Sequence, residues 1–428
     1  MLCKSTHLFV GYTLLFFSAL LQAEISKDRL NTDAHRITLR DAIKKTLEHN
    51  PALNSYRYQL KAQQGLQTQA GTAASPELKF MIEDALGTGD FKAANKTQAT
   101  LSISWVVEGN IRQGYIDEAS AGTLLLTTEA SIKRLDAAAE TARLFLVCLA
   151  NQARLINAAK NVGLADETII AVNQRVQAGK TSEAELARAE ADRERKRLDR
   201  EDLEHGLRSA TRLLAAQWGE TDPKFTRVEG DIFGLPKPLS FEVLKSRLQQ
   251  SPEFLRLMSD RRLKQAQLKL QESLGRPAWR VNLGLRHFET TKDQALVAGI
   301  NIPFGERARN TGRISAAREK LSQTQASQVE LSVRLETTLF ILSEDLQHSL
   351  HRVDAYRSRI IPRLETALKQ TRRAYELGRY SYLEWRSVQV ELLNARTALI
   401  EDSIDVHIKV IEIERLIGIS MLKPTDKK

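Results

Sequence analysis

Three side chains in one helical segment have the spacing of a metal site. Glu344, His348 and His351 stand at positions i, i+4 and i+7, which share one face of a helix. Carboxylate and imidazole groups are common ligands of divalent cations. No second ligand cluster accompanies them, and a solvated polar face explains the same residues. The sequence therefore predicts neither an established metal centre nor a cofactor.

Motifs that carry enzymatic chemistry are missing from the sequence. We find no nucleophile elbow, no phosphate-cradling glycine loop and no C-x-x-C pair. An isolated cysteine on a long helix, Cys148, is expected to be a small buried apolar residue. We therefore predict that the chain is not an enzyme.

Residues 1–23 have the three parts of a secretory signal peptide. Lys4 precedes an apolar run of 14 residues, 8–21, and the small residue Ala23 precedes Glu24. The alternative is a membrane anchor, but a spanning helix needs roughly 20 apolar residues. No cysteine follows the run, so no lipidation site is expected. Removing Cys3 with this leader would leave only Cys148, which predicts no internal disulfide.

The charged residues argue against two other classes of protein. They make up 27% of the chain and the mean hydropathy is −0.34, which excludes a helical membrane protein. The formal charge of +10 falls to +9 without Lys4. Lysine and arginine alternate with acidic residues in segments such as 187–202, which indicates solvated helix faces rather than a nucleic-acid surface.

The chain repeats its own layout. Residues 41–53, DAIKKTLEHNPAL, match 242–254, EVLKSRLQQSPEF, at an offset of 201, and Gly179 matches Gly378 at an offset of 199. We therefore predict two tandem repeats with one architecture. The expected layout is the signal peptide 1–23, a first repeat 24–230 (β-hairpin 77–107, long helix 111–178, helix 182–218), a second repeat 231–420 (β-hairpin 278–304, long helix 308–377, helix 381–417) and a polar tail 421–428.

Each predicted hairpin alternates apolar and polar residues. In PAWRVNLGLRHF, residues 277–288, the apolar positions are Trp279, Val281, Leu283 and Leu285. The four strands are about nine to eleven residues long, which suits a tilted strand in a bilayer. No further strands are expected that could form a second sheet, so a sandwich core is the less favoured reading.

The two predicted long helices have 68 and 70 residues, or about 100 Å each. Leucines from Leu331 to Leu350 recur in coiled-coil steps. Gly163 and Pro362 interrupt the two helices at matching positions, and both residues weaken a helix interior. We expect a bend at each.

Four strands cannot seal themselves in a membrane. An open sheet leaves unpaired backbone groups in hydrocarbon, and single-chain bacterial barrels begin at eight strands. Several copies would therefore share one barrel and align their helices as a tube. The predicted fold is mainly α with a small membrane β part, and the predicted function is a conduit across the cell envelope.

This layout resembles the TolC family of outer-membrane efflux proteins over residues 35–420. The resemblance is carried by ITLRDAIKKTLEHNPAL, GRISAAREKLSQTQ, LGRYSYLEWRSVQVEL, the strand pairs and the duplication. The segment 301–318 is similar to the heavy-metal, CzcC-type branch. The resemblance implies a homotrimer in the outer membrane of a Gram-negative bacterium, a twelve-stranded β-barrel, and twelve helices forming an α-barrel. It also implies a periplasmic adaptor and an inner-membrane resistance-nodulation-division pump as partners.

The resemblance further places the adaptor contact and the gate at two hairpin tips. Glycine is expected to end one helix and serine or threonine to begin the next. We expect Tyr380, Tyr382 and Trp385 to be exposed there for partner contact or gate packing. The predicted tip residues are Ala178, Gly179, Thr181, Ser182, Glu185, Leu377, Gly378, Tyr380, Ser381, Leu383 and Glu384.

The predicted function is a passive channel subunit for heavy-metal cations in a pump–adaptor–channel system. A drug, organic-solute or protein-secretion channel of the same fold is the alternative. A periplasmic coiled-coil scaffold is a remoter alternative from another class.

Overall fold

The computed structural model describes residues 36–419 and groups them into two compact units. The first unit contains residues 36–51, 134–245 and 338–419, and the second contains residues 52–133 and 246–337. Each unit thus combines segments from both halves of the sequence. The predicted signal peptide 1–23 and polar tail 421–428 lie outside the described residues, and the division into two repeats stays a prediction.

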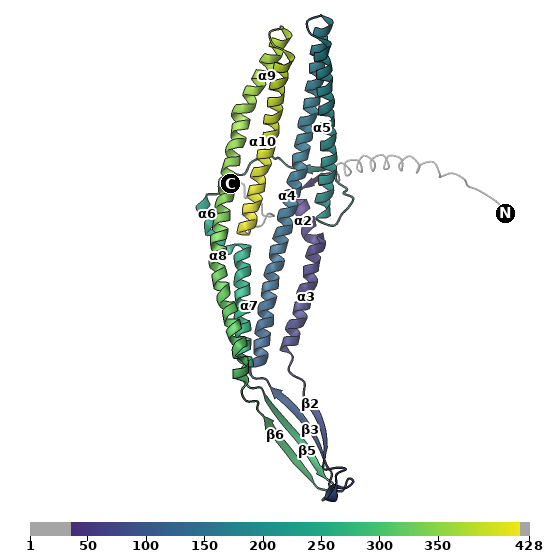
Figure 1. The fold of residues 1–428 in the computed structure, drawn as a ribbon, viewed down its shortest axis with the longest axis vertical. Coiled ribbons are helices and arrows are strands. Elements are labelled where there is room, and N and C mark those ends of the chain that lie inside the picture. Colours follow the sequence, from purple (N-terminus) through teal and green to yellow (C-terminus); the bar gives the residue numbers. More distant parts are fainter. Residues whose placement is uncertain (1–35, 420–428) are drawn as a thin grey trace, which may run out of the picture. The chain divides into compact units, whose positions relative to one another are not determined.

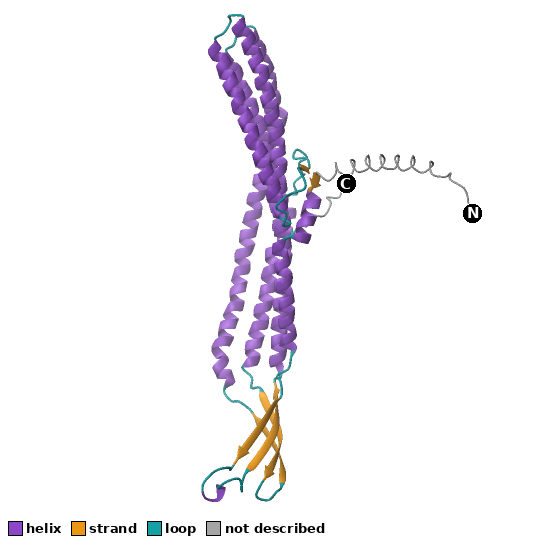
Figure 2. Ribbon diagram, turned by 90° about the vertical axis from the view of Figure 1, so that its right-hand side faces the viewer, coloured by secondary structure: helices purple, strands orange, loops and turns teal. Residues whose placement is uncertain are grey.

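The first unit consists mainly of two helical hairpins (Figures 1 and 2). Its elements are β1 (Arg36–Thr38), α2 (Leu39–His49), the second part of α4 (Asn110–Gln177), α5 (Glu183–Ala216), β4 (Arg227–Glu229), α6 (Phe241–Ser246), the second part of α8 (Glu306–Ala355), the π-helical segment η3 (Tyr356–Ile360), α9 (Ile361–Glu376) and α10 (Tyr382–Ile417).

A two-stranded parallel sheet pairs β1 with β4. The expectation of no strands beyond the two hairpins is therefore wrong, because three-residue strands are too short to show alternation. The side chain of Gln152, on α4, bonds to the backbone of β4 twice. It donates to the Val228 carbonyl oxygen at 2.9 Å and accepts from the Val228 N–H at 2.8 Å.

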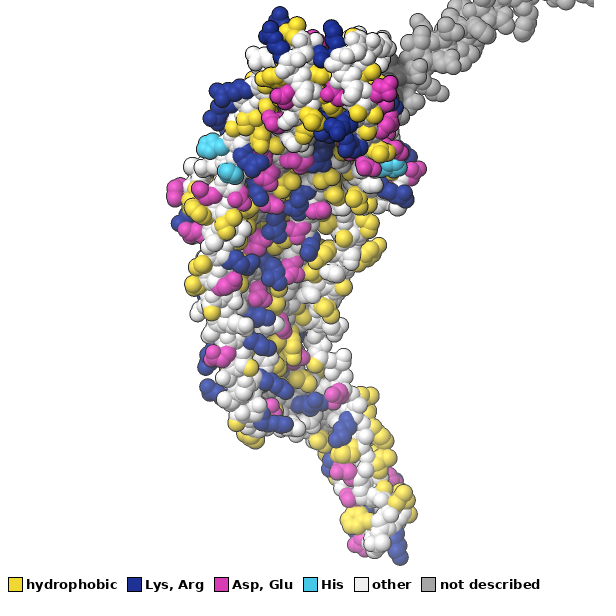
Figure 3. Space-filling view, turned by 45° about the horizontal axis from the view of Figure 1, so that its top comes forward, with side chains coloured by type: hydrophobic (Ala, Val, Ile, Leu, Met, Phe, Trp, Pro, Cys, Tyr) yellow, Lys and Arg dark blue, Asp and Glu magenta, His cyan; other side chains and the backbone are white. Residues whose placement is uncertain are grey.

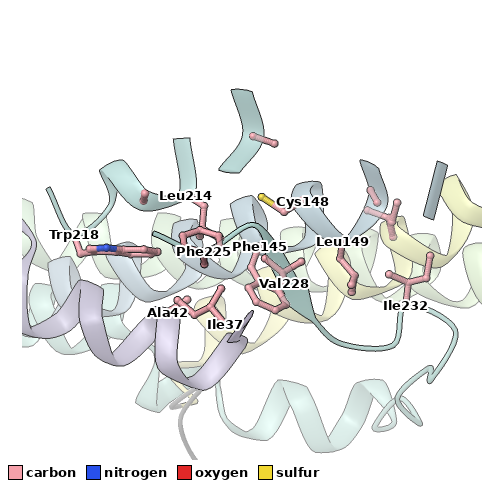
Figure 4. Close-up of a cluster of buried hydrophobic side chains, with 14 of the residues drawn as sticks. Ile37, Ala42, Phe145, Cys148, Leu149, Leu214, Trp218, Phe225, Val228 and Ile232 are labelled. Carbon is pink, nitrogen blue, oxygen red and sulfur yellow. The ribbon is translucent and has the colours of Figure 1, made fainter. Parts of the chain in front are cut away.

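The largest buried cluster of the first unit joins α2, α4, α5 and the segment around β4 (Figure 4). Trp218 and Phe225 pack with their ring centroids 5.9 Å apart. Cys148 is fully buried in this cluster, as its isolated position on the helix suggested. Burial raises the pKa of its thiol to about 12, although a hydrogen bond with Thr211 opposes the shift. The side chain therefore behaves as an apolar core residue.

The second unit contains four helical segments and a four-stranded sheet. Its elements are α3 (Pro51–Gly71), β2 (Glu77–Glu83), the short η1 (Gly89–Phe91), β3 (Gln98–Val107), the first part of α4, the short η2 (Leu248–Gln250), α7 (Pro252–Leu274), β5 (Trp279–Phe288), β6 (Gln294–Asn301) and the first part of α8.

Small residues let the helices of this unit approach closely. A Cβ atom on Gly114 of α4 would lie 3.3 Å from the Cα of Leu270 on α7, so this crossing favours glycine. A Cβ atom added to Gly312, which lies on α8 198 residues after Gly114, would have no other atom within 4 Å. Thr128 and Ser259 share a hydrogen bond of 3.1 Å between α4 and α7.

The sheet has the order β2–β3–β5–β6, and all its neighbours are antiparallel. Two hairpins, β2–β3 and β5–β6, are joined through β3 and β5. Apolar residues of neighbouring strands stand opposite one another, as in the row Phe80, Leu101, Leu285 and Leu296. Leu78 and Leu296 are each 73% exposed, so this apolar face is uncovered in the single chain (Figure 3).

The polar face of the sheet is crowded at two glycines. Gly284 stands opposite Ser102, and a Cβ atom on it would lie 2.6 Å from the Cβ of Ser102. Ordinary cross-strand Cβ distances are about 4.5–5.5 Å. A Cβ on Gly299 would similarly lie 2.7 Å from the Asn282 side-chain oxygen. Side chains that converge in this way lie on the concave side of a curved sheet.

No helix within residues 36–419 combines the length and the hydropathy required to cross a membrane.

Substituting Gly284 tests the curvature. We expect Gly284→Ala to lower stability by about 1–3 kcal/mol, because the added methyl group must displace the Ser102 backbone and side chain. The measurement is the midpoint temperature of thermal unfolding in detergent. Gly312→Ala is the control, since the open helical position should gain about 0.5–1 kcal/mol. Equal midpoints for both variants would contradict the crowded geometry.

Candidate functional site at the hairpin tips

The two hairpins of the first unit end in turns of the same geometry. Gly179 and Gly378 adopt φ angles of 64° and 76°, which L-residues with a side chain rarely adopt. The Gly179 N–H bonds to the Val176 carbonyl at 2.9 Å, and the Lys180 N–H to the Arg175 carbonyl at 2.8 Å. Gly378 and Arg379 repeat this pattern at 2.9 Å each. Both turns are therefore Schellman caps that require glycine.

The helices that leave the turns begin differently. Ser381 forms a capping box with Glu384: the Glu384 N–H bonds to the Ser381 hydroxyl at 3.4 Å, and the Ser381 N–H bonds to the Glu384 carboxylate at 2.7 Å. The Ser381 N–H and the Ser381 hydroxyl, which donates to the same carboxylate at 2.9 Å, lower the pKa of Glu384. Ser182 occupies the matching position but its side chain makes no cap bond. The expected side-chain cap at Ser182 is therefore wrong. The Glu185 carboxylate accepts from the Thr181 hydroxyl at 2.5 Å.

An aromatic cluster fastens the two hairpins together beneath the turns. Tyr375 and Trp385 pack with ring centroids 5.1 Å apart, and the Arg175 guanidinium lies 4.9 Å from the Tyr375 ring. Arg175 also donates to the Tyr375 carbonyl oxygen at 2.6 Å. Burial and the nearby Glu185 carboxylate raise the pKa of Tyr375 to about 12. The cluster therefore joins α4 and α5 to α9 and α10.

The aromatic residues do not all lie where the sequence suggested. Tyr382 and Trp385 are only 2% and 1% exposed, so the expectation that they are exposed is wrong. They belong to one buried cluster with Val172 of α4 and Ala189 of α5. Positions 382 and 385 are three residues apart and therefore share one face of α10, which is the face that meets the other hairpin. Leu377, Tyr380 and Leu383 remain 61%, 45% and 56% exposed. This exposed apolar trio is the candidate contact surface of the tip. Ala178 borders a neighbouring groove of about 340 Å³ between α4 and α9.

Polar contacts continue the link between the hairpins. Arg372 donates to Glu167 at 2.9 Å, and Gln389 donates to Thr168 at 2.9 Å. Asp192 accepts from Arg386 at 3.0 Å, and its other oxygen lies 2.8 Å from the Lys196 ammonium. Burial alone would raise the pKa of Asp192, but its bonds and charges with Lys196 and Arg386 lower it. The buried carboxylate is therefore ionised at neutral pH.

The two predicted bend positions differ in local structure. Helix α4 continues through Gly163, where an added Cβ would meet no atom within 4 Å. On the matching helix, α8 ends at Ala355, the π-helical η3 follows, and Pro362 lies in the first turn of α9. Proline lacks the N–H donor and its ring crowds the carbonyl four residues earlier, which accounts for the wider turn. A bend at either position stays a prediction.

The candidate metal ligands Glu344, His348 and His351 lie exposed on α8. Within residues 36–419, no group of three or more His, Cys, Asp or Glu side chains is placed to hold a metal ion.

Three important tip residues were not singled out from the sequence. Asp192 stands in the charged run 187–202, where nothing distinguishes the single buried carboxylate from its solvated neighbours. Arg175 and Tyr375 stand one turn before the two glycines. They do not occupy equivalent positions, because Arg175 stands four residues before Gly179 and Tyr375 three residues before Gly378. The repeat therefore gave no signal that these two side chains touch.

Comparisons with known proteins agree on the fold over almost the whole chain. The cobalt-zinc-cadmium resistance protein CzcC of Cupriavidus metallidurans is 24% identical over 382 residues, which cover 89% of this chain and 90% of CzcC. A solved structure of CusC, described as forming a transmembrane channel, superposes with a TM-score of 0.74 at 15% identity, covering 89% of this chain and 91% of CusC. The outer membrane protein VceC of Vibrio cholerae gives a TM-score of 0.72 at 15% identity, with 90% and 97% covered. No family model matches the sequence.

The Asp192 contacts give a pH-dependent prediction. Asp192→Asn should speed backbone hydrogen exchange in residues 183–196 and 382–392 at neutral pH, because it removes charged hydrogen bonds worth about 1.5–3 kcal/mol. The folded pKa of Asp192 is lowered, so its stabilisation is present above the unfolded pKa and is lost as pH falls through the folded value.

In acid, the backbone amides of the wild type and of Asp192→Asn should therefore exchange hydrogen at similar rates, after correction for intrinsic exchange rates. Asp199→Asn, an exposed carboxylate on the same helix, is the control and should change nothing. An undiminished difference in acid would contradict the assignment.

Proposed function

We propose that the chain is a TolC-like outer-membrane efflux channel of the heavy-metal branch, and that it forms a homotrimeric passive conduit. The protein resides in the outer membrane of a Gram-negative bacterium. Three copies contribute four strands each to a shared twelve-stranded barrel, and their long helices form the periplasmic tunnel. The channel performs no chemistry and provides an aqueous path with a gate.

The observation that carries this proposal is the uncovered sheet of the second unit. Strands β2 and β6 are its edges. One face presents Leu78, Phe80, Leu296 and Ile300, each at least 63% exposed. An apolar face of this kind suits lipid, but its edges cannot remain unpaired in hydrocarbon. Pairing β6 of one copy with β2 of the next satisfies both edges and closes a ring.

The curvature of the sheet supports closure with the polar face inward. Gly284 and Gly299 mark the polar face as concave, and the apolar face is then convex. Membrane barrels of bacteria have this arrangement, with an apolar exterior and a polar lumen. A periplasmic coiled-coil scaffold would have no use for a curved sheet whose convex face is apolar.

The hairpin tips are the proposed gate and adaptor site. The contacts of Arg175, Arg372 and Arg386 hold α9 and α10 against α4 and α5, and opening would separate these pairs. The exposed trio Leu377, Tyr380 and Leu383 offers an apolar contact for a periplasmic adaptor. An inner-membrane pump of the resistance-nodulation-division type would supply the energy.

Heavy-metal cations are the proposed cargo. The support is the similarity to CzcC over 89% of the chain, since the name of that relative refers to cobalt, zinc and cadmium resistance. Drug, organic-solute or protein export through the same fold is the alternative, because cargo choice rests mainly with the pump. Growth of a deletion strain on zinc, cobalt, cadmium, copper and a drug panel separates these cargoes.

The shared barrel predicts a trimer that resists heat in detergent. Purified protein should migrate as a trimer before boiling and as a monomer after it, and it should conduct ions in a planar lipid bilayer. Both results follow from edge pairing between copies. A water-soluble monomer without conductance would favour the scaffold and overturn the channel proposal.

Locking the two hairpins together should stop export. Glu167→Cys with Arg372→Cys places thiols on α4 and α9, where the native side chains lie 2.9 Å apart. A short bifunctional thiol reagent should block efflux from cells, because opening must separate these helices. Cys148 is buried and gives little background reaction.

The matched control joins two positions within α9. Arg372→Cys with Glu376→Cys receives the same reagent one turn apart on one helix, where a crosslink restrains no relative movement. Efflux should continue in this control. Export that continues equally in the α4–α9 crosslinked protein would show that these hairpins do not separate.

A further inference from the structure

We propose that Lys79 sets the ion selectivity of the barrel, through a ring of three ammonium groups on its inner wall that favours anions over cations. This inference rests on the proposed trimeric channel and adds a specificity-determining residue to it. The inference is based on the register of the sheet. The register shows which charged side chains lie on the polar face, and the ion pairs show which of them are neutralised.

The polar face is built from alternate residues of the four strands. The strand register aligns them in rows, of which one contains Glu77, Ser104, Asn282 and Gly299 and the next contains Lys79, Ser102, Gly284 and Val297. The charged residues on this face are Glu77, Lys79 and Glu83 on β2 and Arg280 and Arg286 on β5.

Both carboxylates on this face have an arginine partner. Arg280 lies 2.5 Å from Glu77, and Arg286 lies 3.0 Å from Glu83. Each pair reaches across β3, and Arg286 also donates to Gln98 at 3.0 Å and to Thr100 at 2.9 Å. These two pairs leave no net charge on either side of the Lys79 row.

Lys79 has no such partner. None of the ion pairs among residues 36–419 includes it, and its row continues with the small or apolar Ser102, Gly284 and Val297. Asp84, the carboxylate that directly follows β2 in the sequence, accepts a hydrogen bond from Gln98 at 2.8 Å. Its ammonium group is therefore the uncompensated charge of the polar face.

Strand β6 of a neighbouring copy, which would pair with β2, cannot neutralise the charge of Lys79. The polar-face residues of β6 are Ala295, Val297, Gly299 and Asn301, all uncharged. Because the copies are identical, the joint between them adds no carboxylate. The polar faces of the four strands in each copy therefore carry one excess positive charge. A trimer would carry three.

The geometry directs these charges into the lumen. Gly284 of β5 lies in the same row as Lys79 of β2, with Ser102 of β3 between them. It is one of the glycines that mark the polar face as concave. Charges of one sign inside a passage with low-dielectric walls focus their field on passing ions. The barrel should therefore prefer anions, which leaves selection of a metal cation to the pump.

The test measures reversal potentials of the purified trimer in planar bilayers across a gradient of potassium chloride. At about 0.01–0.1 M salt the Debye length is about 10–30 Å, so the ring acts across the lumen. We expect an anion preference in the wild type. Lys79→Gln should shift the reversal potential toward cations, and Lys79→Glu should shift it about twice as far, because the charge changes by one and by two units.

Two controls separate charge from structure. Lys79→Arg should keep the wild-type potential, and Lys61→Gln, an exposed lysine on α3, should leave it unchanged. The shifts in reversal potential expected for Lys79→Gln and Lys79→Glu should nearly vanish at 1 M salt, where the Debye length is about 3 Å.

The outcomes distinguish this inference from the channel proposal. Conducting trimers in which the Gln and Glu variants keep the wild-type reversal potential would overturn the role of Lys79 alone. Wild-type protein that neither forms trimers nor conducts would overturn the channel proposal and this inference with it.

Discussion

Backbone hydrogen bonding in hydrocarbon is the constraint on which the proposed assembly depends. The sheet of the second unit satisfies its internal strands β3 and β5, but β2 and β6 remain edges. Water can satisfy such edges and lipid cannot, so a sheet with an apolar convex face must find further strands. The chain cannot supply them, since the other described sheet has strands of only three residues. The proposed assembly would thus supply the strands that the described part of the single chain lacks.

The helices and strands of the two units are held together by different kinds of contact. In the second unit, small residues such as Gly114 and Gly284 allow backbones to approach closely. At the hairpin tips of the first unit, a few aromatic and charged side chains join helices over few contacts. Buried ionic groups such as Asp192 contribute little net stability when paired but are costly when separated. Contacts of this kind suit a joint that has two well-defined states.

Regular periodicity made most of the fold predictable from the sequence. Alternation in residues 277–288 and the leucine spacing in α8 marked the strands and long helices, and the tip glycines marked the turns. Features that depend on three-dimensional packing were not predictable. The burial of Trp385 depends on the opposite hairpin, and the strands β1 and β4 depend on pairing between residues 191 positions apart (Arg36 and Arg227). Ser182 was predicted to cap its helix, but its side chain makes no cap bond, and the Glu185 carboxylate bonds to Thr181.

The contact between Gln152 and β4 has a consequence for the free edge of the small parallel sheet. A side-chain amide offers one donor and one acceptor, the same pair that a peptide unit offers, and here both are used on Val228. It thus imitates an additional strand without extending the sheet. Such a plug denies stray polypeptides a docking edge while the chain is still alone. One amide on α4 thereby occupies the backbone groups of Val228 that another strand would need in order to pair with this edge.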